Sequence, residues 1–187
     1  ACEYASLYFE NAIQRLGYGI STIIPMDIKI GYGYDVHRLE VGEELWLGGI
    51  LLPHHKGAVG HSDADVLLHA ICDALLGALA LRDIGFHFPD TDPAYKGIDS
   101  KKLLAETWNK IEELGWDLGN LDTTICLQTP KLSDSIDSMR KVIAGILHVD
   151  LHRISIKATT TEKLGFVGTQ DGISAHAVVL LKERKRK

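Results

Sequence analysis

The sequence predicts an α+β fold: a two-layer sandwich in which a mixed four-stranded sheet carries helices on one face, with a small β-hairpin beside it. Along the chain, segments with the residue pattern of strands alternate with segments whose apolar residues recur at helical spacing. The length of 187 residues, with 45% hydrophobic and 24% charged residues, suits one domain with a single core. We expect this domain at residues 27–183, after an N-terminal extension of residues 1–26, natural or introduced by cloning, and before a basic tail of residues 184–187.

Four segments predict the strands of the sheet: residues 28–34, 122–128, 153–159 and 173–181. The first of them alternates large and small side chains and would deliver Asp35 and His37 just beyond its end. Gly48-Gly49 joins two further short apolar runs, at 45–47 and 50–52. Because glycines tolerate the positive φ angles of tight turns, this pattern predicts a hairpin.

Three helices are predicted from apolar spacing and capping residues. The first follows Ser62 or Asp63, either of which can cap free amide groups, and continues to about Leu81. The second is expected from residue 99 or 100 to about 115, and the third at residues 139–146.

Between the first two helices, residues 82–98 predict an ordered loop. Gly85, Pro89, Pro93 and Gly97 stand among aspartates and aromatic residues there, a composition that disfavours regular structure. A loop of this length is a candidate functional segment.

Composition argues against several classes of protein. The net charge is −5, and the basic run at the end of the chain predicts a solvated tail rather than a nucleic-acid site. Cys2, Cys72 and Cys126 have no C-x-x-C spacing, so a reducing cytoplasm fits best, without a disulfide framework or a cysteine zinc site. The longest apolar stretch, residues 66–81, is interrupted by His69 and Asp73 and is too short for a membrane span. The N-terminus shows no signal-peptide pattern, which disfavours secretion.

Asp35 and His37 form a D-x-H pair that a strand would turn to one side, and His69 on the most apolar helix would add a third ligand. Two imidazoles and a carboxylate leave a fourth position open on zinc, as in catalytic sites that polarise a phosphate. Taken alone, such a pair more often belongs to ordinary surface or core residues. Asp65 and Asp73 lie one turn on either side of His69, so either could orient its ring or simply cap the helix or face solvent.

Two further segments are rich in polar groups. Residues 157–162, Lys-Ala-Thr-Thr-Thr-Glu, place hydroxyls, a carboxylate and free amides where a strand runs into a turn. Such a cluster suits phosphate oxygens and a hard cation, although threonines favour plain strands in any case. Residues 128–131, Gln-Thr-Pro-Lys, either bind a nucleotide or only connect a strand to a helix.

Taken together and in order, five motifs resemble the family of 2-C-methyl-D-erythritol 2,4-cyclodiphosphate synthases. They are Gly31-Tyr32-Gly33-Tyr34-Asp35-Val36-His37, His61-Ser62-Asp63-Ala64-Asp65-Val66, Asp83-Ile84-Gly85, Phe88-Pro89-Asp90-Thr91-Asp92, and the run from Lys157 to Phe166. The resemblance covers residues 28–182 and is far more specific than the D-x-H pair. It is this resemblance, rather than any spacing, that predicts the function.

The resemblance implies an enzyme that converts 4-diphosphocytidyl-2-C-methyl-D-erythritol 2-phosphate to 2-C-methyl-D-erythritol 2,4-cyclodiphosphate and releases CMP, in non-mevalonate isoprenoid biosynthesis. It implies that Asp35, His37 and His69 bind a zinc-like divalent cation, and that Glu162 binds a second one, magnesium or manganese. His61 and Thr160 would assist catalysis. The positions implied to contact the substrate are Asp35, Val36, His37, His61, Ser62, Asp83, Ile84, Gly85, Phe88, Pro89, Asp90, Thr91, Asp92, Leu127, Gln128, Thr129, Pro130, Lys131, Leu132, Ser133, Thr159, Thr160, Thr161, Glu162 and Phe166.

The resemblance also implies a homotrimer whose active sites lie between neighbouring chains, with a cytidine diphosphate compound as the partner and neither nucleic acid nor membrane. Thr169 and His176 stand where the family often carries an Arg and a Glu facing the trimer axis. We therefore expect weak or no binding of isoprenoid diphosphates there, because the bidentate phosphate partner is lost. Two other functions stay open: a zinc-dependent phosphohydrolase and a non-catalytic trimeric nucleotide-binding protein.

Overall fold

A computed structural model describes residues 27–184 of the chain. The expected N-terminal extension, residues 1–26, and residues 185–187 of the expected basic tail lie outside the described part. The one tail residue inside it, Arg184, forms an ion pair with Asp117 at 2.5 Å.

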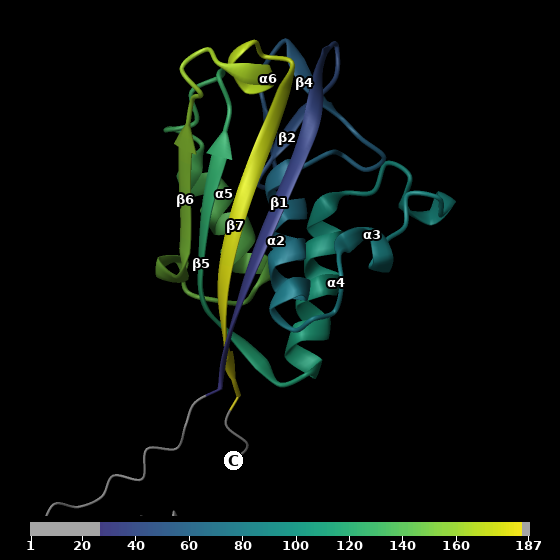
Figure 1. Ribbon diagram of the computed structural model, residues 1–187, viewed down its shortest axis with the longest axis vertical. Helices are drawn as coiled ribbons and strands as arrows, with labels where there is room; N and C mark the ends of the chain where they lie inside the picture. The colour runs from purple at the N-terminus through teal and green to yellow at the C-terminus, as the bar shows by residue number, and fades with distance from the viewer. Residues whose placement is uncertain (1–26, 185–187) are drawn as a thin grey trace, which may run out of the picture.

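The chain folds into a mixed sheet with helices against one face, which confirms the predicted α+β class (Figure 1). The strands in the sheet are β1 (Ile28–Val41), β4 (Lys56–Val59), β5 (Trp116–Cys126), β6 (Ile154–Thr159) and β7 (Gly172–Glu183). Their order is β4-β1-β7-β5-β6. Strands β5 and β6 run parallel, and the other neighbours run antiparallel.

The sheet has five strands, so the prediction of four was wrong. Residues 56–59 form the additional strand β4, which pairs with β1 from Arg38↔Val59 to Val41↔Lys56. This run, Lys-Gly-Ala-Val, is too short to show strand alternation, and its structure depends on the distant partner. The predicted hairpin is confirmed as β2 (Leu45–Leu47) paired with β3 (Ile50–Leu52).

Strand β1 also continues past the predicted end at residue 34. It pairs with β7 from Ile28↔Lys182 to Arg38↔Gly172, so Asp35 and His37 lie within the strand rather than beyond it. Their side chains are partly buried on the face that bears the helices, while Tyr34 and Val36 are exposed on the other face.

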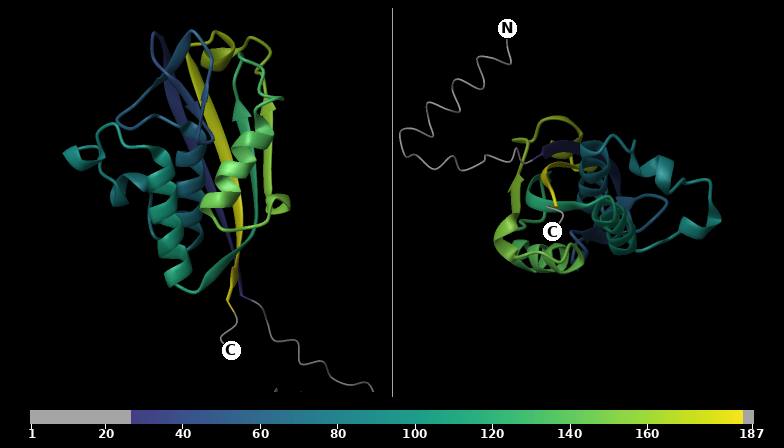
Figure 2. Two further views of the ribbon diagram at one scale, coloured as in Figure 1. Left: turned by 180° about the vertical axis from the view of Figure 1, so that it is seen from behind. Right: turned by 90° about the horizontal axis from the view of Figure 1, so that it is seen from below.

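The helical layer consists mainly of α2 (Val66–Ala78), α4 (Ser100–Glu113) and α5 (Ile136–Ile146) (Figure 2). Helix α2 packs on β1 and β7, and ten of its thirteen residues are buried. Its N-cap is Asp65, rather than Ser62 or Asp63 as predicted, and it ends three residues earlier than Leu81. Helix α4 begins at its predicted cap, Asp99.

The predicted irregular loop of residues 82–98 contains two short helices, α3 (Ile84–His87) and η1 (Pro93–Tyr95). Asp83 caps α3 by accepting a hydrogen bond from the Phe86 amide at 2.8 Å, which allows one helical turn despite the glycine. Two other short helices, η2 (Leu151–Arg153) and α6 (Gly165–Gly168), precede β6 and β7. None of the helices in residues 27–184 combines the length and apolar composition needed to cross a membrane.

Candidate metal centre and active site

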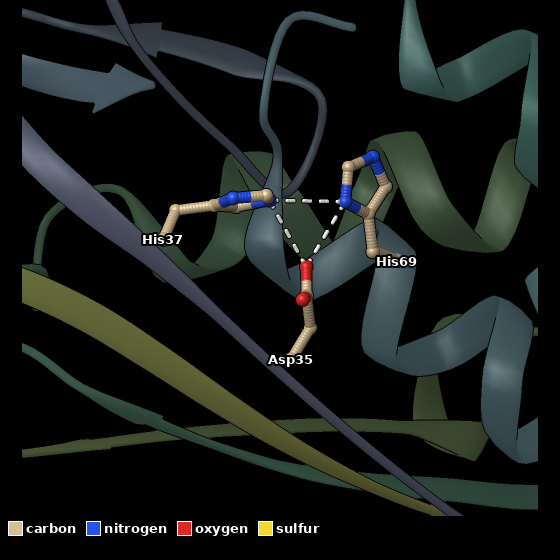
Figure 3. Close-up of side chains that lie close together, drawn as sticks. All are labelled: Asp35, His37 and His69. Atoms are coloured by element: carbon tan, nitrogen blue, oxygen red, sulfur yellow. Dashed lines mark hydrogen bonds and ion pairs between the residues drawn. The ribbon is translucent and has the colours of Figure 1, made fainter. Parts of the chain in front are cut away.

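Three polar side chains from two elements meet at one point between the sheet and helix α2 (Figure 3). Asp35 and His37 come from β1, and His69 comes from the first turn of α2. Asp35 Oδ2 lies 3.1 Å from His37 Nε2 and 3.0 Å from His69 Nδ1, and these two nitrogens are 3.1 Å apart. The structure therefore brings together the three residues expected to bind a zinc-like ion.

The triangle of donor atoms fits a small divalent metal. Ligand bonds of about 2.0 Å at tetrahedral angles separate neighbouring ligand atoms by about 3.3 Å. The observed edges of 3.0–3.1 Å are close to that value. One carboxylate oxygen and two imidazole nitrogens are typical zinc ligands, and three protein ligands leave a position for substrate. Within residues 27–184, these three form the one group of His, Cys, Asp and Glu side chains arranged to hold a metal.

The electrostatics of the triangle favour a charged carboxylate. Burial opposes ionisation of Asp35, but hydrogen bonds and charge from His37 and His69 outweigh it and hold the pKa of Asp35 well below its ordinary value. Burial likewise opposes the charged form of His69, yet the carboxylate of Asp35 raises the pKa of His69 above its ordinary value. Asp35 is therefore ionised at neutral pH, as a metal ligand must be.

Neither Asp65 nor Asp73 orients the His69 ring, although both had been considered for that role. Asp65 is fully buried and accepts hydrogen bonds from the amides of Gly48, Gly49, Leu67 and Leu68. Asp73 accepts a hydrogen bond from the amide of Ile84 at 2.7 Å and so fixes the start of α3. Both carboxylates accept hydrogen bonds from backbone amides. Their hydrogen-bonding capacity is therefore used without the His69 ring.

A cavity of about 240 Å³ opens beside the triangle. Its lining includes eight of the residues expected at the metal and substrate sites: His37, His61, Ser62, His69, Ile84, Gly85, Phe88 and Asp90. Tyr95, Ile98 and Leu103 also line it and were not predicted. Asp83, Pro89, Thr91 and Asp92 lie in the same segment of chain without lining the cavity.

The expected nucleotide segments form a second cavity, of about 270 Å³. It is lined by Leu127, Gln128, Pro130, Lys131, Leu132 and Ser133 together with Thr159 and Thr160. The Leu127 amide donates to the Thr159 carbonyl at 3.0 Å, and Gln128 Oε1 accepts from the Lys163 amide at 3.3 Å. Parallel pairing of β5 with β6 therefore brings both segments to one edge of the sheet.

Glu162 and Phe166 lie next to these segments. Thr160 Oγ1 donates a hydrogen bond to Glu162 Oε1 at 3.1 Å in an exposed turn. Phe166, in α6, is 47% exposed and packs beside Gly172 at the start of β7. Thr129 donates a hydrogen bond to Gln170 at 2.8 Å, which ties the segment after β5 to the segment after α6.

Within one chain the two cavities are far apart. The candidate metal ligands Asp35 and His37 lie on β1, whereas the second cavity lies at the ends of β5 and β6. Two strands, β7 and β5, separate β1 from β6. At about 4.8 Å between neighbouring strands, this corresponds to roughly 14 Å across the sheet.

Thr169 and His176, which depart from the family pattern, both make hydrogen bonds with neighbouring residues. His176 Nδ1 lies 3.0 Å from the hydroxyl of Tyr32 on the exposed face of the sheet. Thr169 donates a hydrogen bond to a carboxylate oxygen of Asp171 at 2.5 Å. A carboxylate, rather than a guanidinium, therefore lies next to the hydroxyl of Thr169.

The fold and the triangle of donor atoms define a class: two-layer α+β proteins with an Asp-His-His group placed to hold a divalent metal. The comparison with protein families is more specific. The chain belongs to the YgbB family, whose model matches residues 28–182.

Several proteins similar to this chain are named 2-C-methyl-D-erythritol 2,4-cyclodiphosphate synthase. A protein of Bacteroides fragilis named 2-C-methyl-D-erythritol 2,4-cyclodiphosphate synthase is 61% identical over 156 residues, which is 83% of this chain and 98% of that protein. A solved structure with the same enzyme name is 40% identical, has a TM-score of 0.76, and is matched over 82% of this chain and 99% of that chain. The structure titled as the CDP complex of Plasmodium falciparum IspF is 35% identical, has a TM-score of 0.75, and is matched over 84% and 97% of the two chains.

Proposed function

We propose that this chain is an enzyme of isoprenoid biosynthesis that closes 4-diphosphocytidyl-2-C-methyl-D-erythritol 2-phosphate into 2-C-methyl-D-erythritol 2,4-cyclodiphosphate and releases CMP. The observation that carries the proposal is the triangle of Asp35, His37 and His69 beside a cavity, in a chain 61% identical to a protein of that name. We propose residues 27–183 as the catalytic domain and the cytoplasm as its location.

In this reaction the nucleophile belongs to the substrate. An oxygen of the 2-phosphate attacks the β-phosphorus, and the bond from that phosphorus to the CMP oxygen breaks. A phosphate is already ionised near neutral pH, so alignment and neutralisation of charge matter more than a protein base. Asp35, His37 and His69 would hold a divalent cation, which would supply positive charge for polarising a phosphate oxygen.

The two cavities suit the two ends of this substrate. His61 and Ser62 line the cavity beside the triangle, where their polar groups would bind the phosphate of the methylerythritol end. Lys131 and Thr160 line the second cavity and would bind the diphosphate, with cytosine against the segment of residues 127–133. The structure of the similar Plasmodium falciparum protein is named as a CDP complex, which supports a cytidine diphosphate compound as the substrate.

We place a second cation, magnesium or manganese, at Glu162. Its carboxylate is exposed next to the hydroxyl of Thr160, and oxygen ligands suit either ion. One carboxylate is enough because diphosphate oxygens and water commonly complete the coordination of such an ion.

We infer that the active enzyme is a homotrimer in which a metal site of one chain meets the nucleotide cavity of the next. The separation of the two cavities within one chain supports this proposal, because one substrate must contact both. The sheet face opposite the helices exposes Ile30, Tyr32, Tyr34 and Val36 of β1 and Val178 of β7. A contiguous apolar face of this kind is typical of a protein interface.

The experiment is turnover of the diphosphocytidyl substrate with zinc and magnesium present, followed by mass spectrometry. We expect equimolar CMP and cyclic diphosphate. A linear hydrolysis product would instead indicate a phosphohydrolase, and tight nucleotide binding without turnover would indicate a binding protein. Either result would overturn the proposal.

A further inference from the structure

The ring nitrogen of His69 that faces away from the triangle has two hydroxyl neighbours. Nε2 lies 2.9 Å from Ser100 Oγ and 3.1 Å from Ser62 Oγ. Ser100 is fully buried at the first position of α4, far along the chain from His69. A neutral imidazole carries its proton on one nitrogen only, so when Nδ1 binds a metal the proton is on Nε2 and needs an acceptor there.

Asp63 determines how the hydroxyl of Ser100 is oriented. Asp63 Oδ1 accepts the hydroxyl hydrogen bond of Ser100 at 2.5 Å, and Oδ2 accepts the backbone amide of the same residue at 3.0 Å. A serine hydroxyl has a single proton, and an ionised carboxylate can only accept. With its proton committed to Asp63, Ser100 Oγ can only accept from His69 Nε2–H, which is the arrangement required when Nδ1 binds a metal. Without a metal, Nδ1 faces the ionised carboxylate of Asp35 at 3.0 Å instead.

Ser62 alone does not determine which nitrogen of His69 carries the proton. Its Oγ accepts the Ala64 amide at 3.1 Å and retains a proton that could be donated in several directions. Were that proton given to Nε2 of His69, the ring proton would move to Nδ1 and block the metal position. Of the two serines, Ser100 is the one with a carboxylate that fixes its hydroxyl.

From this network we propose that Asp63 and Ser100 are positioning residues for the metal ligand His69, and that they orient its ring and accept the Nε2 proton while Nδ1 binds the metal. The proposal rests on the proposed metal site. Carboxylates and hydroxyls that orient metal-binding histidines commonly contribute roughly ten- to hundredfold in metal affinity.

The same contacts connect the metal ligand to the beginning of α4. The Asp63 amide donates to the Ile98 carbonyl at 3.1 Å, and the Gly97 amide donates to the His61 carbonyl at 2.7 Å. The segment that carries His61 is therefore held against the end of the 82–98 loop. A change at Asp63 should affect His69 through Ser100, without touching substrate.

The test uses ¹⁵N-histidine NMR of the full-length zinc-loaded protein and zinc affinity measured by competition with a chelating dye. In the unsubstituted protein we expect the Nε2 proton of His69 to be slow to exchange with water, because buried Ser100 accepts it. In Ser100→Ala this proton should exchange faster, and the zinc dissociation constant should rise roughly ten- to hundredfold. Ser135→Ala is the matched control, because Ser135 also stands at a helix start but makes no capping hydrogen bond with its side chain.

Asp63→Asn provides a second variant that keeps Ser100 and nearly the same shape. It should release the hydroxyl proton of Ser100 and produce the same two shifts, so the proposal stays testable if Ser100→Ala does not fold. Zinc affinity within twofold of the unsubstituted protein and unchanged exchange of the Nε2 proton, in either folded variant, would overturn it. Failure of the unsubstituted protein to bind zinc would contradict the proposed function instead.

Discussion

Asp35 Oδ2 and His69 Nδ1 lie 3.0 Å apart although 34 positions separate the residues in sequence. The approach of helix α2 to strand β1 makes this contact possible. A β-carbon at Gly33 would lie 1.9 Å from the carbonyl oxygen of Ala70, and one at Gly31 would lie 1.8 Å from that of Ala74. These two glycines therefore allow the backbone of α2 to rest directly on β1, with His69 opposite Asp35.

Replacing Gly33 with Ala should disturb both stability and metal binding. The added carbon must push α2 away from β1, and overpacking of this kind commonly costs about 1–3 kcal/mol. We expect a lower midpoint in urea unfolding and weaker zinc binding, because the donor triangle is opened. Gly145→Ala is the control: it lies in helix α5 with no atom within 4 Å of the added carbon, so it should be neutral or stabilise by up to about 1 kcal/mol. Equal effects of the two substitutions would contradict this explanation.

His69→Ala should lose the zinc-like ion and most activity while the fold survives. The side chain supplies one of three ligands, but the helix around it is held by apolar residues such as Leu68 and Ile71. Metal analysis together with circular dichroism checks this prediction. A folded variant with full metal occupancy would rule out His69 as a ligand.

Asp65 should contribute more to stability than an ordinary helix cap. Its buried carboxylate accepts from four amides, two in the hairpin turn and two in α2. Asp65→Ala leaves these buried donors without a partner, so we expect a loss of at least about 3 kcal/mol in the free energy of unfolding. Asp150→Ala is a suitable comparison, since Asp150 caps η2 without a side-chain hydrogen bond and should change stability little. A similar small loss for Asp65→Ala would refute the proposed role.

Features determined by neighbouring residues could be predicted from the sequence. Asp99 and the apolar spacing after it predicted α4 correctly, and Gly48-Gly49 predicted the hairpin. Strand β4 was missed because its four residues become a strand only through pairing with β1, and β1 itself was predicted too short for the same reason. Local sequence carries little information about such distant partners.

The residues of the site fall into the same two groups: those that the sequence predicted and those that depend on packing between distant segments. The D-x-H pair, the place of His69 on the apolar helix and the family resemblance predicted Asp35, His37 and His69 as ligands, and the structure places their donor atoms together. Ser100 was recognised only as a possible helix cap, because its contact with His69 depends on how the start of α4 packs against residues 61–63. An aspartate inside the H-S-D motif was the one signal that could have pointed to this network.

Mixing two inactive variants tests whether the active site is shared between chains. His69→Ala removes a metal ligand, and Lys131→Ala removes a cation from the nucleotide cavity. In randomly mixed trimers of equal composition, an intact metal site meets an intact nucleotide cavity at roughly a quarter of the interfaces. Turnover should therefore recover to about that fraction after the variants are refolded together, provided each alone is inactive. No recovery from demonstrably mixed trimers would exclude a shared site.

The central claim is that the substrate's own phosphate, rather than water, attacks the β-phosphorus. Turnover in ¹⁸O-labelled water tests it directly, with mass spectrometry of both products. Intramolecular attack takes no oxygen from solvent, so we predict unlabelled CMP and an unlabelled cyclic diphosphate. One ¹⁸O atom in CMP, or a linear product carrying ¹⁸O in place of the cyclic diphosphate, would show that water is the nucleophile and would contradict the proposed cyclisation.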